Sequence, residues 1–86
     1  MAQDFSVTGK VIDENSNPLS FVNVLVYENA DETPREGTTT DEDGSFALKN
    51  LASGTYNINF SYIGFKEIQH TIQLSSNHDF GNVVME

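Results

Sequence analysis

Apolar and polar residues alternate along most of this chain, and no stretch repeats apolar residues at the spacing of a helix. Successive side chains of a strand point to opposite faces of a sheet, so this alternation predicts strands with one buried face. Residues typical of turns, mainly Gly, Pro, Asn, Asp and Ser, recur between the alternating segments. The chain is therefore predicted to be an all-β domain.

About seven strands are predicted from this pattern. The first runs over Phe5–Asp13 and the second over about Phe21–Glu28, followed by a polar acidic loop over residues 29–36. The others are predicted at residues 38–40, 45–48, 56–62, 65–74 and 80–85. This number of short strands is typical of a Greek-key sandwich of two sheets. The apolar side chains predicted to fill its core are Val7, Val22, Val24, Phe46, Leu48, Tyr56, Ile58 and Phe60.

The segment between Thr38 and Leu48 is predicted to be a hairpin. Asp41 suits the first position of a type I turn, and Gly44 suits the last. This turn is expected to fix the register of residues 38–40 against residues 45–48. A second turn is predicted over residues 51–54, and Gly54 and Gly64 are expected to relieve tight bends.

The 86 residues are enough for one small domain, which must be held together by core packing because the chain has no cysteine. Thirteen acidic residues against four basic ones give a formal net charge of −9. The cations are scattered, whereas nucleic-acid binding needs clustered cations, and an anionic membrane surface would repel the chain. No segment has the pattern of a transmembrane helix or of a signal peptide. Neither a nucleic-acid partner nor direct membrane insertion is expected.

An ordered series of short motifs resembles a known domain family. The motifs are Val7-x-Gly9-x-Val11-x-Asp13, Asn17-Pro18-Leu19, Val22-x-Val24-x-Val26, the run from Thr40 to Phe46, Leu51-x-x-Gly54-x-Tyr56, and Tyr62 to Phe65. Their order resembles the carboxypeptidase D regulatory-like domain, a transthyretin-like (prealbumin-like) sandwich of seven strands. The resemblance covers nearly the whole chain. It implies structural roles for Gly9, Pro18, Asp41, Gly44, Phe46, Gly54, Tyr56 and Gly64.

Within that family the chain is most similar to the amino-terminal extension of TonB-dependent outer-membrane transporters and related β-barrel proteins of Bacteroidetes-type bacteria. There the module follows a signal peptide, lies in the periplasm, and precedes the plug and barrel. The resemblance implies a non-catalytic accessory module whose partner is the neighbouring plug or barrel domain, or another periplasmic or outer-membrane protein. Since the sequence stops at Glu86, residues 1–86 are expected to be a domain excised from a larger protein.

The acidic turn invites comparison with a calcium-binding loop. If Gly44 is aligned with the glycine of an EF-hand loop, Thr39 and Asn50 occupy the first and last ligand positions. Those positions require aspartate and a bidentate glutamate, so a simple turn is favoured and weak surface calcium binding stays as an alternative. His70 is expected at the rim of the core and His78 in a solvated turn, without a second histidine or cysteine at metal-ligand spacing.

The sequence contains no catalytic motif: no G-x-S-x-G, no cysteine nucleophile and no phosphate-binding loop. No cofactor, metal or catalytic residue is therefore expected. A carbohydrate-binding module remains an alternative because exposed aromatic side chains can stack on sugars, and a standalone scaffold or adhesion domain of a secreted protein is a third. The candidate contacts for a sugar or a partner strand are Tyr27, Thr38 and Thr40.

Overall fold

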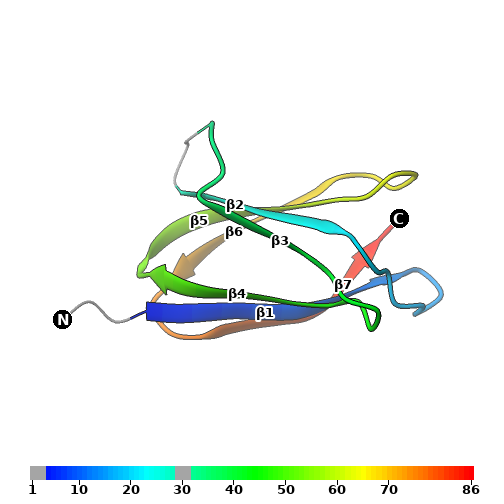
Figure 1. The fold of residues 1–86 in the computed structure, drawn as a ribbon, viewed down its shortest axis with the longest axis horizontal. Coiled ribbons are helices and arrows are strands. Elements are labelled where there is room, and N and C mark those ends of the chain that lie inside the picture. Colours follow the sequence, from blue (N-terminus) through cyan, green and yellow to red (C-terminus); the bar gives the residue numbers. More distant parts are fainter. Residues whose placement is uncertain (1–3, 29–31) are drawn as a thin grey trace.

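The computed structural model of the chain describes residues 4–28 and 32–86, and these residues form seven strands and no helix (Figure 1). The strands are β1 (Asp4–Asp13), β2 (Asn23–Glu28), β3 (Glu36–Thr39), β4 (Ser45–Ala52), β5 (Gly54–Ser61), β6 (Ile68–Leu74) and β7 (His78–Met85). The predicted all-β class and the predicted number of strands are confirmed.

The strands form two sheets that pack face to face (Figure 1). One sheet has the order β4-β1-β7, and the other has the order β3-β2-β5-β6. Only β1 and β7 pair in parallel; the other pairs of neighbouring strands are antiparallel. Because β2–β3 and β5–β6 are the only successive strands that share a sheet, the remaining connections cross from one layer to the other.

The core lies between the two sheets and contains every side chain predicted for it. Those eight residues are all buried, with at most 5 % of the surface of any of them exposed. The ring of Phe46 meets the ring of Phe60 edge-on at 5.4 Å. Gly9 makes room for that ring, because a Cβ at this position would lie 2.8 Å from the Phe46 side chain. This close approach explains the glycine in the middle of β1.

The predicted hairpin between residues 38–40 and 45–48 is wrong. The turn at residues 41–44 is tight as expected, but β3 pairs with β2 and β4 pairs with β1. The reason is long-range: Thr40 binds the backbone at Val22, and Gly44 binds the backbone at Val11. These bonds direct the two strands into different sheets, so the turn is a corner of the sandwich.

Each neighbour of β1 carries one extra residue. In β4 the register shifts between Phe5 and Val7, where Asn50 has a φ of 62°, so Leu48 and Leu51 both point inward. In β7 the register shifts between Thr8 and Lys10, opposite the Phe80–Gly81 segment. Such bulges bend a strand and reverse the inward parity of its side chains.

Several strand limits differ from those predicted. β2 begins at Asn23, two residues after Phe21, and β6 begins at Ile68 because residues 62–65 form a turn. β4 continues to Ala52, which reduces the turn predicted over residues 51–54 to Ser53 alone. Of the predicted acidic loop, residues 29–31 lie outside the described residues, as do residues 1–3.

Candidate interaction surface

Three connections gather at one end of the sandwich, which we call the turn end (Figure 1). It consists of residues 14–22 between β1 and β2, residues 41–44 between β3 and β4, and residues 62–67 between β5 and β6. Backbone hydrogen bonds tie two of these connections to other parts of the chain, one to β1 and one to the residue that follows β7. The amide of Val11 donates to the carbonyl of Gly44 over 2.8 Å, and the amide of Lys66 donates to the carbonyl of Glu86 over 2.8 Å.

The acidic corner at Asp41 is a backbone cap. One carboxylate oxygen of Asp41 accepts the amides of Asp43 and Ser45 over 2.9 and 3.0 Å, and its carbonyl accepts the amide of Gly44. Gly44 has a φ of +78°, and a Cβ there would lie 2.5 Å from the carbonyl oxygen of Val11. Any larger residue would thus push the corner away from β1. These contacts explain Asp41 and Gly44 without a metal ion.

Thr40 fastens the corner to the residues that precede β2. Its hydroxyl donates to the carbonyl of Leu19 over 2.6 Å and accepts the amide of Val22 over 2.9 Å. Its own backbone exchanges two further bonds with Phe21 and Val22. Only 1 % of Thr40 is exposed, so a partner or a sugar has no access to it. The prediction that Thr40 is a surface contact is wrong, because its hydroxyl binds the backbone of Leu19 and Val22 inside the corner.

This fastening displays Phe21 to solvent. Phe21 lies between two residues held by Thr40, takes a φ of 64° and is 68 % exposed. A positive φ is unusual for a bulky side chain, and such conformations persist only where the surroundings impose them. The bonds to Thr40 impose it here.

The loop after β1 is built around Asp13. Its carboxylate accepts the amides of Asn15 and Asn17, over 2.8 and 2.9 Å, and a 3.3 Å bond from the side-chain amide of Asn17. The hydrogen bond from the Asn17 backbone is the main reason that the pKa of Asp13 lies below its usual value. Pro18 pairs with Ile12 and closes the loop beside Gly44. Pro18, for which the resemblance implies a structural role, thus lies in the corner between β1 and Gly44.

Ile63 is at the tip of the β5–β6 connection and is 91 % exposed. The amide of Phe65 bonds to the carbonyl of Tyr62 over 3.1 Å, with Gly64 at φ +88°, as in a type II turn. The rings of Tyr62 and Phe65 lie 5.7 Å apart and pack against the core, which leaves Ile63 alone at the outside. Tyr62 and Phe65 are therefore half-buried supports and do not form an exposed sugar platform.

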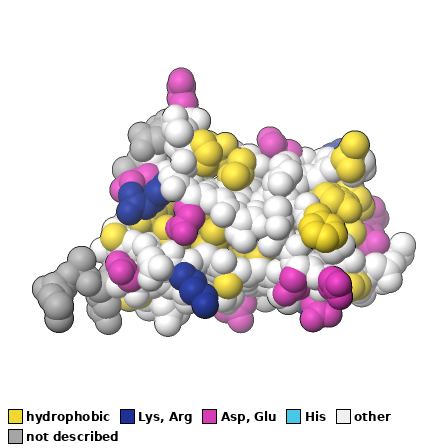
Figure 2. Space-filling model, in the orientation of Figure 1, with side chains coloured by type: hydrophobic (Ala, Val, Ile, Leu, Met, Phe, Trp, Pro, Cys, Tyr) yellow, Lys and Arg dark blue, Asp and Glu magenta, His cyan; other side chains and the backbone are white. Residues whose placement is uncertain are grey.

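Apolar and acidic side chains adjoin on the turn end (Figure 2). Phe21 and Ile63 are accompanied by Glu14, Asp41, Glu42 and Asp43, all of which are exposed. Lys66 of the same end is exposed as well, so acidic side chains outnumber basic ones there without excluding them. Such a surface suits a partner of opposite charge.

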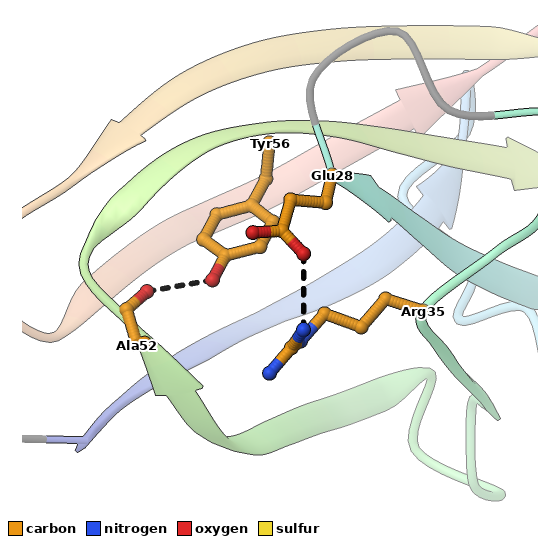
Figure 3. Close-up of polar contacts among 4 residues, drawn as sticks. All are labelled: Glu28, Arg35, Ala52 and Tyr56. Atoms are coloured by element: carbon orange, nitrogen blue, oxygen red, sulfur yellow. Dashed lines mark hydrogen bonds and ion pairs between the residues drawn. The ribbon is translucent and has the colours of Figure 1, made fainter.

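The opposite end of the sandwich is closed by Tyr56 (Figure 3). Its hydroxyl donates to the carbonyl of Ala52 over 2.7 Å, across the corner where Gly54 begins β5. Burial is the main reason that the pKa of Tyr56 lies above its ordinary value. Nearby, Arg35 and Glu28 form an ion pair of 3.0 Å whose side chains are 45 % and 42 % exposed, so it adds at most about 1 kcal/mol to stability.

The structure does not bring together the three residues predicted to contact a sugar or a partner. Tyr27 is half-buried on the outer face of the β2–β5 pair, while Thr38 pairs with the buried Val24 and shares the inner face. Thr40 is buried in the corner. Thr38 lies in β3, which is an outer strand of its sheet.

The two histidines lie beside Phe80. His70 is exposed on β6, with its ring 5.4 Å from that of Phe80 and 6.0 Å from that of Phe60. His78 begins β7, is half-buried, and meets Phe80 edge-on at 4.7 Å. The prediction of a solvated turn for His78 is therefore wrong. Among residues 4–28 and 32–86, no group of three or more histidine, aspartate or glutamate side chains is placed to hold a metal ion.

The alternation in the sequence does not distinguish the two exposed apolar residues of the turn end, Phe21 and Ile63, from buried ones. Ile63 had a readable signal, because it precedes Gly64 and so falls at the outer corner of a type II turn. Phe21 had none, since its exposure depends on hydrogen bonds to Thr40, nineteen positions away.

Within the part of the chain that the structure describes, no helix is long and apolar enough to cross a membrane.

Solved structures share this fold over almost the whole chain. A 3-chlorocatechol 1,2-dioxygenase from Rhodococcus opacus 1CP is 11 % identical, with a TM-score of 0.79 over 99 % of this chain and 60 % of that one. A cohesin–X-dockerin complex from Acetivibrio cellulolyticus is 15 % identical, with a TM-score of 0.76 over 94 % of this chain and 56 % of that one. A pilus 2b backbone protein of group B streptococcus is 16 % identical, with a TM-score of 0.73 over 96 % and 41 %. This chain spans less than two thirds of each, and the likeness at these identities concerns the fold alone.

Comparison with curated protein sequences found no match. A family model, in contrast, matches residues 7–86, which include all seven strands except the first three residues of β1. Its description is the CarboxypepD_reg-like domain, the family that the ordered motifs resemble. The chain therefore belongs to the CarboxypepD_reg-like domain family.

Proposed function

We propose that this domain is a non-catalytic docking module, carried in the periplasm at the amino terminus of a TonB-dependent outer-membrane transporter or a related barrel protein. The resemblance of the ordered motifs to that group of extensions supports the location. The observation that carries the docking role is the exposure of Phe21 and Ile63, at 68 % and 91 %, on one end of a sandwich that buries its core well.

The chemistry of the turn end supports a partner with apolar pockets and a basic rim. Phe21 and Ile63 fit apolar pockets, and the surrounding Glu14, Asp41, Glu42 and Asp43 favour a rim of lysine or arginine. Such a surface on the neighbouring plug or barrel domain, or on another periplasmic protein, is the proposed docking site. Charge complementarity of this kind speeds association and fixes orientation, and the apolar anchors supply affinity.

A non-catalytic role agrees with the use of the carboxylates. Asp13, Asp41 and Asp79 each accept backbone amides of their own loop or bulge, which is a structural task. The family to which the chain belongs is a regulatory-like domain and supports the same conclusion.

The test uses the full-length parent protein. Removing residues 7–86 is expected to lower substrate uptake while the barrel still folds and inserts, as judged by its heat-modifiable migration. The paired substitutions Phe21→Ser and Ile63→Ser should lower uptake to a similar degree, and the exposed Val84→Ser serves as a matched control. Wild-type uptake by the deletion variant would refute the proposal.

Carbohydrate binding is the second candidate, and one feature favours it. A shallow hollow lies along β1 between β4 and β7, lined by Thr8, Gly9, Lys10, Ser45, Phe46, Asp79, Gly81 and Asn82. Its hydroxyl, amide and charged groups resemble those that bind sugar hydroxyls, and it is a better site than Tyr27. Titration with oligosaccharides, followed by NMR, should then shift the amides around Asn82 and not those around Tyr27. No shift at either place would remove this candidate.

A further inference from the structure

The four outer strands of the two sheets differ in how they are protected against pairing with another chain. β3 has only four residues and begins with Glu36. β4 and β7 carry bulges, together with Lys49 and Asp79 respectively. Short length, bulges and charged side chains are the usual means by which sheet edges avoid further pairing.

β6 has none of these protections. It runs for seven residues, Ile-Gln-His-Thr-Ile-Gln-Leu, without lysine, arginine, aspartate, glutamate, proline or glycine. Its pairing with β5 is continuous from Ile68 to Leu74, with no shift of register. Its other side pairs with no strand among the described residues, so alternate backbone amides and carbonyls of β6 are directed outward.

The sequence of β6 is complementary to itself in the antiparallel direction. With a two-fold axis through Thr71, Thr71 faces Thr71, and Gln69 of one copy faces Gln73 of the other. On the opposite face of the strand, Ile68 faces Leu74 and His70 faces Ile72. The threonine–threonine pair across strands is favourable. The two symmetry-related His70–Ile72 pairs are the mixed pairs of this register. The flanking charges do not oppose one another, because Glu67 would face Ser75 and Lys66 would face Ser76.

The surface beside the β6 edge contains partly exposed apolar side chains that a second apolar surface could cover. Ile68 and Ile72 point from β6 toward the core and are only half-buried, as is Phe80 next to His70. A second β6 paired at this edge would extend the sheet, and its Ile68 and Ile72 would cover the half-buried Ile68 and Ile72 of the first copy. We propose that the domain associates with a second copy of itself through antiparallel β6–β6 pairing centred on Thr71, which joins two four-stranded sheets into one.

The association is expected to be weak. A contact along one short strand buries less than about 1,200 Å². Each copy carries a net charge of −9, so moderate salt should strengthen it by screening. Sedimentation of the wild-type domain, from micromolar to millimolar concentration and at two salt concentrations, should show a dimer fraction that rises with concentration.

Charge at the two-fold axis tests the register. Thr71→Lys places two like charges in direct opposition and should abolish the dimer, and Thr71→Glu should do the same. A one-to-one mixture of these two variants should restore it as a heterodimer. Thr39→Lys is the matched control, since Thr39 is exposed on the outer strand at the other edge of the same sheet, and it should leave the dimer intact. Thermal melting of each variant confirms its fold, because Thr71 also donates a 2.6 Å hydrogen bond to Asn57.

Cross-linking gives a second measure that does not depend on charge. Opposed side chains have Cβ atoms about 5 Å apart, near the span of a disulfide, so Thr71→Cys should cross-link rapidly under mild oxidation. Gln69→Cys should not, because two copies of residue 69 would be displaced by about 13 Å along the strands. The chain has no cysteine of its own to interfere. A wild-type domain that stays monomeric at millimolar concentration, or equal cross-linking at residues 69 and 71, would overturn the proposal and leave the edge for a strand of another protein.

Discussion

Thr40 shows how much a single hydroxyl group can hold in a small sandwich. It binds the carbonyl of Leu19, which is partly buried, and the amide of Val22, which is buried in the corner between the sheets. A buried backbone group left without a partner costs about 1–3 kcal/mol. The hydroxyl therefore helps to direct β2 and β3 into one sheet and β4 into the other.

The substitution Thr40→Val keeps the shape of the side chain and removes both bonds. We expect it to lower the free energy of unfolding by about 1–3 kcal/mol, measured by urea denaturation. Thr39→Val, one residue earlier and exposed, should change it by less than about 0.5 kcal/mol. Equal midpoints for the two variants would contradict the role given to this hydroxyl.

Tyr56 makes stability depend on alkaline pH. Burial raises its pKa in the folded state, so the folded protein holds the phenolic proton more tightly than the unfolded chain does. The corresponding stability is complete below about pH 10, the usual tyrosine pKa, and is lost as the pH rises through the higher folded value. Urea midpoints measured across this range should fall more steeply for wild type than for Tyr56→Phe. The variant should also be less stable at neutral pH by about 0.5–1.5 kcal/mol, since it lacks the bond to Ala52.

At the scale of elements, the bulge in β4 determines which side chains enter the core. The extra residue lets both Leu48 and Leu51 point inward, and Asn50 takes the left-handed conformation that this requires. Asn50→Gly should keep or slightly raise the melting temperature. Asn50→Val should lower the free energy of unfolding by about 1–2 kcal/mol, because a β-branched residue is strained at this φ. If the thermal melts of the two variants coincide, the bulge does not constrain the conformation of residue 50.

Alternation in the sequence predicted the strands and the core, but not which strands pair. The parity of Phe46, Leu48, Tyr56, Ile58 and Phe60 is a local property, and all of these side chains are buried as predicted. Pairing depends on bonds between distant residues, such as Thr40 with Val22, so the short turn at Asp41 predicts a hairpin that the structure does not form. The bulges were missed because each shifts the parity by one residue, as in Phe80 and Val83.

The candidate site was less predictable than the fold. Its carboxylates were recognised as parts of turns, and Asp41 does cap the backbone. Its apolar residues were not recognised, since an isolated Phe21 in an alternating segment reads as part of a strand. Exposure is decided by what the rest of the chain covers, and that information is not local.

At the scale of the whole molecule, one cluster between two sheets supplies most of the stability. Phe46 of β4 links the two sheets within this cluster, because its ring lies against the ring of Phe60 in β5 and also against that of Phe80. Phe46→Ala should cost about 3–5 kcal/mol, a large share of the roughly 5–15 kcal/mol available to a small domain. We expect no cooperative unfolding transition to remain above about 37 °C in calorimetry. The exposed Phe21→Ala is the control, and an unshifted transition for Phe46→Ala would refute the central place of this ring.

The parallel pairing of β1 and β7 has a mechanical consequence. β1 begins at one end of the long axis and β7 finishes at the other (Figure 1). Tension applied between the two ends of the domain would pull these neighbouring strands in opposite directions along their length. The hydrogen bonds between β1 and β7 would then bear the load together in shear. An antiparallel pair pulled from one end would instead open one bond at a time. A module stretched between a membrane anchor and a tethered partner would, with this arrangement, transmit force before it unfolds.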